Sequence, residues 1–187
     1  MSRFIPINLV RVAHENSTAC SSCGGVCCKG LPGEILPSDL GEGLNAVELY
    51  TRMREMLMSG QYAVDWWENY HPADEDEATR TYGACGYYLR PAIQGQEGRW
   101  FDGSYGGACV FHSDEAGCAL EAHQRPHSCL TLVPSVDEQG RPNCDHADGW
   151  EGKLGAAKAW WPYRHLFESL KHDPRRDEVT LVSGQAA

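Results

Sequence analysis

The sequence lacks any long hydrophobic run, and no window approaches the roughly 18 apolar residues of a membrane-spanning helix. Pro6 and Asn8 interrupt the one apolar stretch near the N-terminus, so we expect neither a secretory signal nor a membrane partner. Positive charge is also scarce, since 16 Lys and Arg stand against 26 Asp and Glu, for a net charge of −10. Nucleic-acid binders usually present a basic surface, so we expect no nucleic-acid partner.

Familiar catalytic signatures are missing as well. The chain contains no phosphate-binding P-loop, dinucleotide-binding fingerprint, GxSxG elbow or HExxH motif. It also contains no internal repeat or long low-complexity segment. Hydrophobic residues make up 42% and charged residues 22%, as in ordinary folded domains, which excludes a disordered chain. The length of 187 residues suits one domain, which we predict over residues 1–173, followed by a loosely ordered tail over 174–187.

Cysteine, in contrast, is abundant, with nine residues. We expect a reducing cytoplasmic compartment, in which persistent disulfides are rare, and the odd count agrees because full pairing would leave one thiol over. Clustered cysteines in such a compartment are typical of metal or redox chemistry. The sequence therefore predicts a metal-binding protein.

The first cluster reads Cys20-Ser-Ser-Cys23-Gly-Gly-Val-Cys27-Cys28. A two-residue gap lets one turn present the sulfurs of Cys20 and Cys23 to the same metal. The two glycines that follow permit the positive φ angles needed to bring Cys27 or Cys28 round. Adjacent cysteines usually point in different directions, so Cys27 and Cys28 can serve two centres, or one of them can pack in the core.

Five more cysteines follow along the chain: Cys85, Cys109, Cys118, Cys129 and Cys144. Pro126 stiffens the approach to Cys129. Arg125 can donate hydrogen bonds toward thiolates or fix a loop carbonyl, so we include it as a residue that supports the cofactor. Any one late cysteine could be an inert buried thiol, but the set favours joint metal binding.

The order of these motifs resembles the YkgJ-type cysteine-cluster family. The resemblance rests on Cys20-x2-Cys23-x3-Cys27-Cys28, then Cys109-Val-Phe, Gly117-Cys118-Ala-Leu and Arg125-Pro126-x2-Cys129, and it spans roughly residues 20–145. That family is described as zinc- or iron-chelating and as containing an iron–sulfur cluster. The resemblance implies these metal ligands: Cys20, Cys23, Cys27, Cys28, Cys109, Cys118 and Cys129. Family members commonly have Arg just after the last cysteine, where this chain has Leu130.

The identity of the metal stays open at this point. Thiolates favour zinc, Cu(I) or an iron–sulfur cluster over magnesium or calcium. Zinc would occupy two closed sites of four cysteines each, whereas a 4Fe-4S cluster needs four cysteines at one locus. The family description favours the cluster, and zinc is the alternative. Four histidines could replace a thiolate ligand, with His127 best placed: His112, His123, His127 and His146.

The sequence allows several functions. The centre could be structural or could store or transfer metal, or it could serve an enzyme that performs redox or group-transfer chemistry on a small molecule or peptide. A flagellin lysine methylase carries a similar cysteine pattern, which permits the enzyme hypothesis. The pairs Trp66-Trp67, Tyr87-Tyr88 and Trp160-Trp161 could then line a pocket, with His71, Arg90 and Asp102 as polar groups, although core packing explains the aromatic residues as well. A thiol–disulfide oxidoreductase using Cys20 and Cys23 is a third hypothesis.

The fold class that we predict is α+β: a small, irregular, metal-centred domain with a few helices, short strands and long loops around the cysteine cluster. Asn45 should cap a helix that runs to about residue 58, with Val47, Tyr50, Met53 or Arg54, and Leu57 on one face and Gly60 as its stop. We predict a second helix over residues 62–70 and short strands over 83–118, with Asp102-Gly103 as a hairpin-like turn. A short helical turn is expected around 119–123, and residues 136–148 are polar and turn-rich. A last helix over 151–171 should be kinked near Trp161 by Pro162.

Overall fold

A computed structural model of the chain describes residues 25–30, 32–71, 84–104, 106–115, 117–136, 138–140, 142–146 and 154–178. The predicted ligands Cys20 and Cys23 lie outside these residues, and of Cys27 and Cys144 only the backbone is described. The fold is α+β, as predicted. Its helices are α2 (Val26–Gly30), α3 (Pro37–Leu40), α4 (Ala46–Met58), α5 (His127–Leu130), α7 (Gly155–Trp160) and α8 (Arg164–Lys171), with 3-10 turns η2 (Ala122–Gln124) and η3 (Trp161–Tyr163). Its strands are β1 (Tyr62–Glu68), β2 (Cys85–Pro91), β3 (His112–Ser113), β4 (Gly117–Cys118), β5 (Leu132–Val136) and β6 (Pro142–His146).

The start of helix α4 is as predicted. The side chain of Asn45 accepts hydrogen bonds from the amides of Val47 and Glu48, and the Glu48 carboxylate accepts one from the Asn45 amide, which completes a capping box. Gly60 follows the helix at φ 75°. The predicted apolar face was partly wrong: Met53 and Leu57 are buried, but Val47 is 74% exposed and Leu49 is buried in its place.

The helix predicted over residues 62–70 was wrong, because Tyr62–Glu68 is strand β1. It pairs antiparallel with β2, and Val64 lies opposite Leu89. Aromatic and branched side chains suit a pleated surface, and here β2 supplies the hydrogen-bonding partner that a single sequence window does not reveal. Single bridges extend the sheet on both sides, from Ile35 to Leu89 and from Phe101 to Val64.

The predicted turn at Asp102-Gly103 does not join a hairpin. Asp102 follows the bridge residue Phe101, and its amide donates to the Val64 carbonyl. The hairpins lie elsewhere: β3 pairs with β4, and β5 pairs with β6, which lies inside the stretch predicted to be turn-rich. The helical turn expected around 119–123 is present as η2.

The last helix is interrupted at Pro162, as predicted. Helix α7 ends at Trp160, η3 holds Pro162, and α8 begins at Arg164. Proline has no amide hydrogen, so the regular α-helical ladder cannot continue through it. Trp160 and Phe167, both fully buried, anchor this segment in the core, and the Trp160 indole donates to the Ile35 carbonyl over 2.7 Å.

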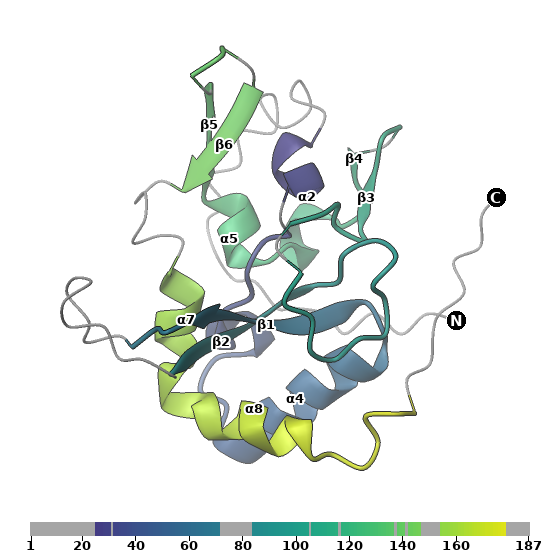
Figure 1. Ribbon diagram of the computed structural model, residues 1–187, viewed down its shortest axis with the longest axis vertical. Helices are drawn as coiled ribbons and strands as arrows, with labels where there is room; N and C mark the ends of the chain where they lie inside the picture. The colour runs from purple at the N-terminus through teal and green to yellow at the C-terminus, as the bar shows by residue number, and fades with distance from the viewer. Residues whose placement is uncertain are drawn as a thin grey trace.

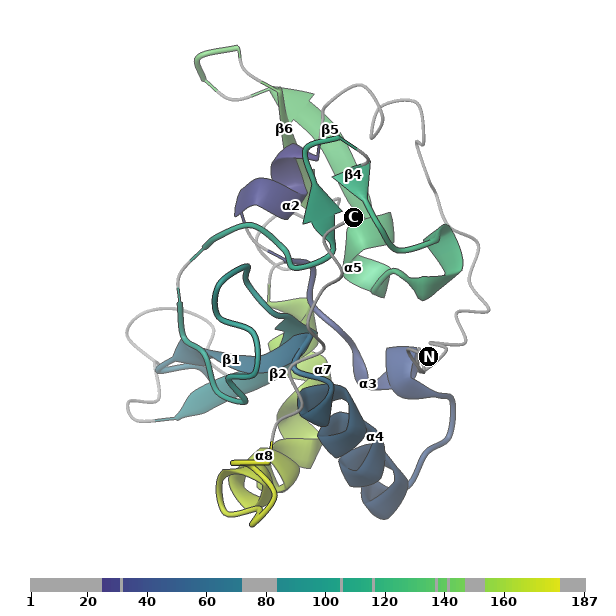
Figure 2. The ribbon, with the colours of Figure 1, turned by 90° about the vertical axis from the view of Figure 1, so that its right-hand side faces the viewer.

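The chain is arranged in two regions. In Figure 1, α4, α7 and α8 lie with the β1–β2 sheet in the lower half, while α2, α5, β3–β4 and β5–β6 gather above it. Figure 2, turned by 90°, shows the same division. The lower region holds most of the core, with α7 and α8 against β2 and α4 against β1. Among the described residues, no helix is both long and apolar enough to cross a membrane.

Candidate functional site

Helix α2 carries the end of the first cysteine motif. It follows Gly25, which lies at φ 75° in the left-handed region that favours glycine. Cys28 is half-buried and packs against the edge of the core. The short helix therefore turns the chain so that the Cys28 side chain faces the protein.

Cys109 lies directly beside Cys28. Its amide donates a 2.7 Å hydrogen bond to the Cys28 carbonyl, and the Gly107 amide donates one of 2.8 Å to Gly30. Residues 107–109 thus run alongside residues 28–30, at the end of the first cysteine motif. Cys109 is 6% exposed and near Tyr62, whose pKa is raised first by burial and then by the charge on the Cys109 sulfur.

Cys118 and His112 face each other across the β3–β4 hairpin. Their Cα atoms form a register pair, which places them about 5 Å apart. The His112 amide also donates to the Cys109 carbonyl over 2.9 Å. The hairpin therefore brings Cys118 next to the Cys28–Cys109 pair, and Cys118 is a half-buried free thiol.

The His112 imidazole closes over Gly25 at the start of α2. A Cβ atom built at Gly25 would lie 2.6 Å from Nε2 of His112, so no larger residue fits without displacing the ring. His112 is 7% exposed. His127 was the better placed of the possible nitrogen ligands in the sequence, and the structure shows that the backbone of His112 contacts Cys109 and pairs with Cys118. The spacing of Cys109 and Cys118 around His112 is the signal that could have identified it.

Cys129 approaches the same segment from helix α5. A Cβ atom at Gly33 would lie only 2.1 Å from the Cys129 sulfur, so the sulfur rests on the bare α-carbon of this glycine. The neighbouring Ser128 hydroxyl donates to the Glu34 carbonyl over 2.6 Å. Both contacts fix Cys129 against the chain that leaves α2.

Arg125 and Pro126 set the path into α5. Nε of Arg125 donates to the Leu120 carbonyl over 3.0 Å, which is one of the two roles predicted for it. Pro126 is the N-cap residue of α5. The His127 amide donates to Oδ2 of Asp39, a fully buried carboxylate that also accepts from the Leu36 amide. Helices α3 and α5 are therefore tied together next to Cys129.

The two remaining cysteines differ in position. Cys144 lies in β6, a strand that packs against α2, with its Cα opposite Pro134 of β5. Cys85 begins β2 and pairs with Glu68, at the far end of the strand from Pro91. Six residues at roughly 3.3 Å each put about 20 Å between Cys85 and Pro91. Because Cys109 bridges Ile93, beyond Pro91, the structure separates Cys85 from Cys109.

The elements that carry Cys28, Cys118, Cys129 and Cys144 thus all lie in the upper region of the fold (Figures 1 and 2). Within the residues described, no three His, Cys, Asp or Glu side chains form a group that could hold a metal ion. The donor types nevertheless suit a soft metal. Because Gly25 and Gly33 have no side chain, His112 and Cys129 can approach the backbone next to α2 closely.

A separate cluster of buried charges lies in the β1–β2 sheet. Arg90, with no exposed surface, donates through Nε to Asp65 over 2.7 Å and through Nη2 to the Asp102 carboxylate over 2.9 Å. Burial raises the pKa of Asp65 although Arg90 opposes it. Burial would also raise the pKa of Asp102, but hydrogen bonds from Ser104 and Arg90 outweigh it and lower that pKa. Arg90 and Asp102 therefore hold the sheet together and do not line a pocket.

Glu34 is a further buried acid, 4% exposed. Burial raises the pKa of Glu34 to about 8, although hydrogen bonds from the Ala156 amide and from Trp67 act to lower this pKa. Near neutral pH its carboxyl group is therefore mostly protonated. Glu34 directly follows Gly33, against which the Cys129 sulfur rests.

The aromatic pairs divide between core and surface. Trp160 and Tyr88 are buried in the core, whereas Tyr87 and Trp161 line a cavity of about 440 Å³ together with Cys85. Trp66 and Trp67 line another, of about 350 Å³. His71 packs edge-on against Trp161, with 4.7 Å between the ring centroids.

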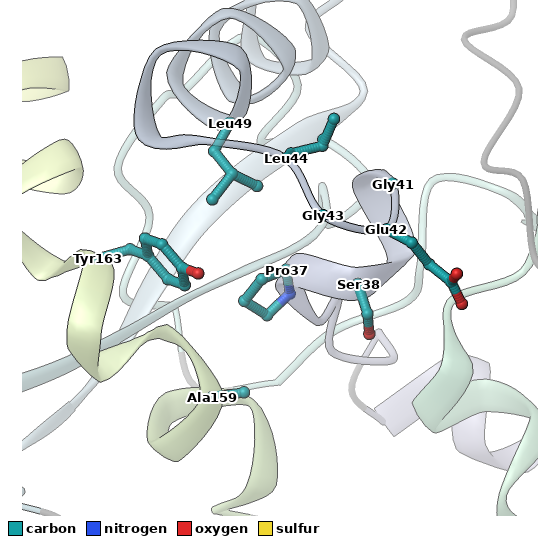
Figure 3. Close-up of a pocket in the computed structure, with 9 residues that line it drawn as sticks. All are labelled: Pro37, Ser38, Gly41, Glu42, Gly43, Leu44, Leu49, Ala159 and Tyr163. Carbon is teal, nitrogen blue, oxygen red and sulfur yellow. The ribbon is translucent and has the colours of Figure 1, made fainter.

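A third cavity, of about 400 Å³, opens between α3, α4 and the α7–η3 segment. Figure 3 shows Leu49, Pro37 and Ala159 around it, with the Tyr163 ring on one side and the Glu42 carboxylate at the edge. None of its lining residues is a cysteine, so it lies apart from the candidate metal centre.

No family model matches the chain, and no curated protein or solved structure matches it either. The resemblance to the YkgJ-type family therefore rests on the cysteine motifs alone.

Proposed function

We propose that this protein binds a 4Fe-4S cluster through thiolates gathered around helix α2. The observation that carries the proposal is the hydrogen bond from the Cys109 amide to the Cys28 carbonyl, which brings two distant cysteine motifs together. Cys118 is held next to them by the β3–β4 register, and Cys129 reaches the same segment through Gly33. Inert thiols usually pack singly as small apolar groups. Several cysteine-bearing segments that come together therefore favour a shared ligand.

The first motif would supply further candidate ligands, of which, together with the later cysteines, one 4Fe-4S cluster needs four. Cys20 and Cys23 precede α2 by a few residues, and Cys27 lies within it. The other candidate ligands are the cysteines whose contacts are described above: Cys28, Cys109, Cys118 and Cys129. Arg125 would act indirectly, by fixing the Leu120 carbonyl and hence the loop that leads to Cys129. A reducing cytoplasm would keep these thiols available as ligands.

A cluster of this type supplies one-electron chemistry, and with an open coordination position it supplies group-transfer chemistry on a small molecule or peptide. The chain's own part is to hold the ligands on short, well-anchored elements and to shield them. Cys109 contributes most to the shielding, since it is 6% exposed and next to the core residue Phe111.

The alternative is a zinc-binding structural or interaction module with two sites of four cysteines and no catalysis. The placement of Cys144 on β6, packed against α2, favours this alternative because it brings an eighth cysteine near the others. Zinc at such closed sites would stabilise the fold directly.

Anaerobic purification followed by quantification of iron, zinc and acid-labile sulfide distinguishes the two. The cluster predicts iron with a near-equal amount of sulfide. Zinc without sulfide would contradict the cluster and support the zinc-binding alternative. Protein free of both metals would overturn the metal-binding proposal itself.

A further inference from the structure

The cavity that contains Cys85 has its own chemistry. It is about 440 Å³ in volume and opens between the start of β2 and the η3–α8 segment. Small-molecule sites usually occupy roughly 300–1,000 Å³, so this volume suits a small organic ligand. Cys85 is a half-buried free thiol on its wall, separated from the cysteines around α2.

Among the described residues that line this cavity, Arg164 supplies a positive charge, although the chain as a whole carries −10. Arg164 and His165 line it and are exposed, and within the described residues Arg164 pairs with no carboxylate. Its guanidinium lies 5.1 Å from the centroid of the Trp161 ring, which holds it at the wall.

Glu168 is the acid among the described lining residues, and its charge is already neutralised. Glu168 pairs with Lys171 over 2.9 Å, and the Lys171 ammonium also donates to the Tyr87 hydroxyl over 2.6 Å. The charges of Glu168 and Lys171 therefore cancel, and the positive charge of Arg164 remains.

The walls are built on rigid elements. Tyr87 stacks on the fully buried Phe167, with 5.4 Å between the ring centroids. Next to Cys85, a Cβ atom at Gly86 would overlap the Tyr70 ring, so the strand is closely packed there. A thiol held in this way keeps a fixed position relative to Arg164.

We propose that this cavity binds small anionic disulfides and that Cys85 undergoes thiol–disulfide exchange with them. The Cys85 thiol loses its proton to solvent, and the thiolate attacks one sulfur of the bound disulfide. A new bond forms between the Cys85 sulfur and that sulfur, while the disulfide's own S–S bond breaks. The other half leaves as a thiolate and takes up a proton, so the disulfide is the only oxidant needed. Arg164 attracts the carboxylates of the reagent and thereby raises the rate of encounter.

The test compares three disulfides on the whole protein: glutathione disulfide (anionic), 2-hydroxyethyl disulfide (neutral) and cystamine (cationic). Mass spectrometry of the Cys85 peptide gives the rate for each reagent, divided by its rate with a simple model thiol. We expect the normalised rate with glutathione disulfide to exceed that with cystamine about fivefold, at the lower end of electrostatic steering, and the ratio to shrink in 0.5 M salt.

Arg164→Gln should bring the three normalised rates close together. Arg176→Gln is the matched control, because Arg176 is also exposed and also lies over an aromatic ring, that of Phe101, but outside the cavity. It should leave the preference unchanged. A Cys85 peptide that stays unmodified, equal normalised rates in the parent protein, or equal effects of both arginine variants would each overturn the proposal. The readout is confined to the Cys85 peptide, so its outcome does not depend on whether the protein binds a metal.

Discussion

The amide of Cys109 donates a 2.7 Å hydrogen bond to the carbonyl of Cys28, and this contact joins the first cysteine motif to the rest of the chain. It is a backbone contact, so it fixes the course of both segments irrespective of what the sulfurs bind. Around it, Cys118 and His112 are paired across one hairpin and Cys129 rests on Gly33. The clustering is therefore built into the main chain.

Replacing Cys109 should remove bound metal, whereas replacing Cys85 should not. Cys109→Ser takes a thiolate from the group around α2, and Cys85→Ser alters a thiol that the β1–β2 sheet holds far from it. Metal content per protein, measured after anaerobic purification, should fall by at least about half for Cys109→Ser, since a lost cysteine ligand typically disables its centre. Equal metal content in both variants would count against the ligand assignment.

Gly33→Ala should destabilise the protein by about 1–3 kcal/mol, the usual range for overpacking. Its new methyl group would lie 2.1 Å from the Cys129 sulfur, so α5 or the 32–34 segment has to move. Urea unfolding of the metal-loaded protein measures the change. Gly30→Ala is the control, because a Cβ atom there meets nothing within 4 Å, and it should change stability by less than about 0.5 kcal/mol. Similar losses in both variants would show that the contact with Cys129 is unimportant.

Arg90→Gln should be among the most destabilising single changes, at about 3–5 kcal/mol, because it leaves Asp65 and Asp102 buried without their cation. The exposed pair of Arg175 with Glu178 offers a comparison, and Arg175→Gln should cost less than about 1 kcal/mol. Chemical denaturation of both variants measures the difference. A loss below about 1 kcal/mol for Arg90→Gln would mean that the buried ion pairs contribute little.

Glu34 should make stability fall as the pH rises. Its pKa is about 8 in the folded protein and near its ordinary value of 4.5 in the unfolded chain, so between these values the folded state holds the extra proton. The contribution is full below about pH 4.5, declines by up to about 1.4 kcal/mol per pH unit above it, and levels off above pH 8. Glu34→Gln keeps a neutral side chain of similar shape and should remove this decline. Unfolding free energies of the two proteins at pH 5 and pH 8 give the measurement, and parallel pH profiles would contradict the assignment.

Local rules predicted much of the helical structure. The Asn45 cap and the break at Pro162 depend on neighbouring residues alone, so the sequence was enough to place them. Which face of α4 is buried was predicted less well. Val47 is exposed and Leu49 is buried, so tertiary packing determines the buried face. Strand β1 was missed because its polar core position, Asp65, is satisfied by Arg90 from another strand.

The sequence named the candidate cysteines of the site, but it did not show how they are grouped in space. Motif spacing suggested the cysteines, yet it could not show that Cys85 lies in the β1–β2 sheet, away from Cys109. Nor could it show that Gly25 and Gly33 make room for His112 and Cys129, because both contacts join segments far apart in the chain. The same limit applies to His112, whose position opposite Cys118 depends on the β3–β4 register.

Metal-edge X-ray absorption on the anaerobically purified protein tests the central claim most directly, because it reports the atoms bound to the metal. The account predicts an iron edge with a first shell of sulfur and a second shell of iron, as in a 4Fe-4S cluster. A zinc edge with four sulfurs at about 2.3 Å would support metal binding by thiolates but contradict the iron–sulfur cluster. A first shell of oxygen and nitrogen alone, or no bound metal, would contradict the claim that these cysteines form a metal centre.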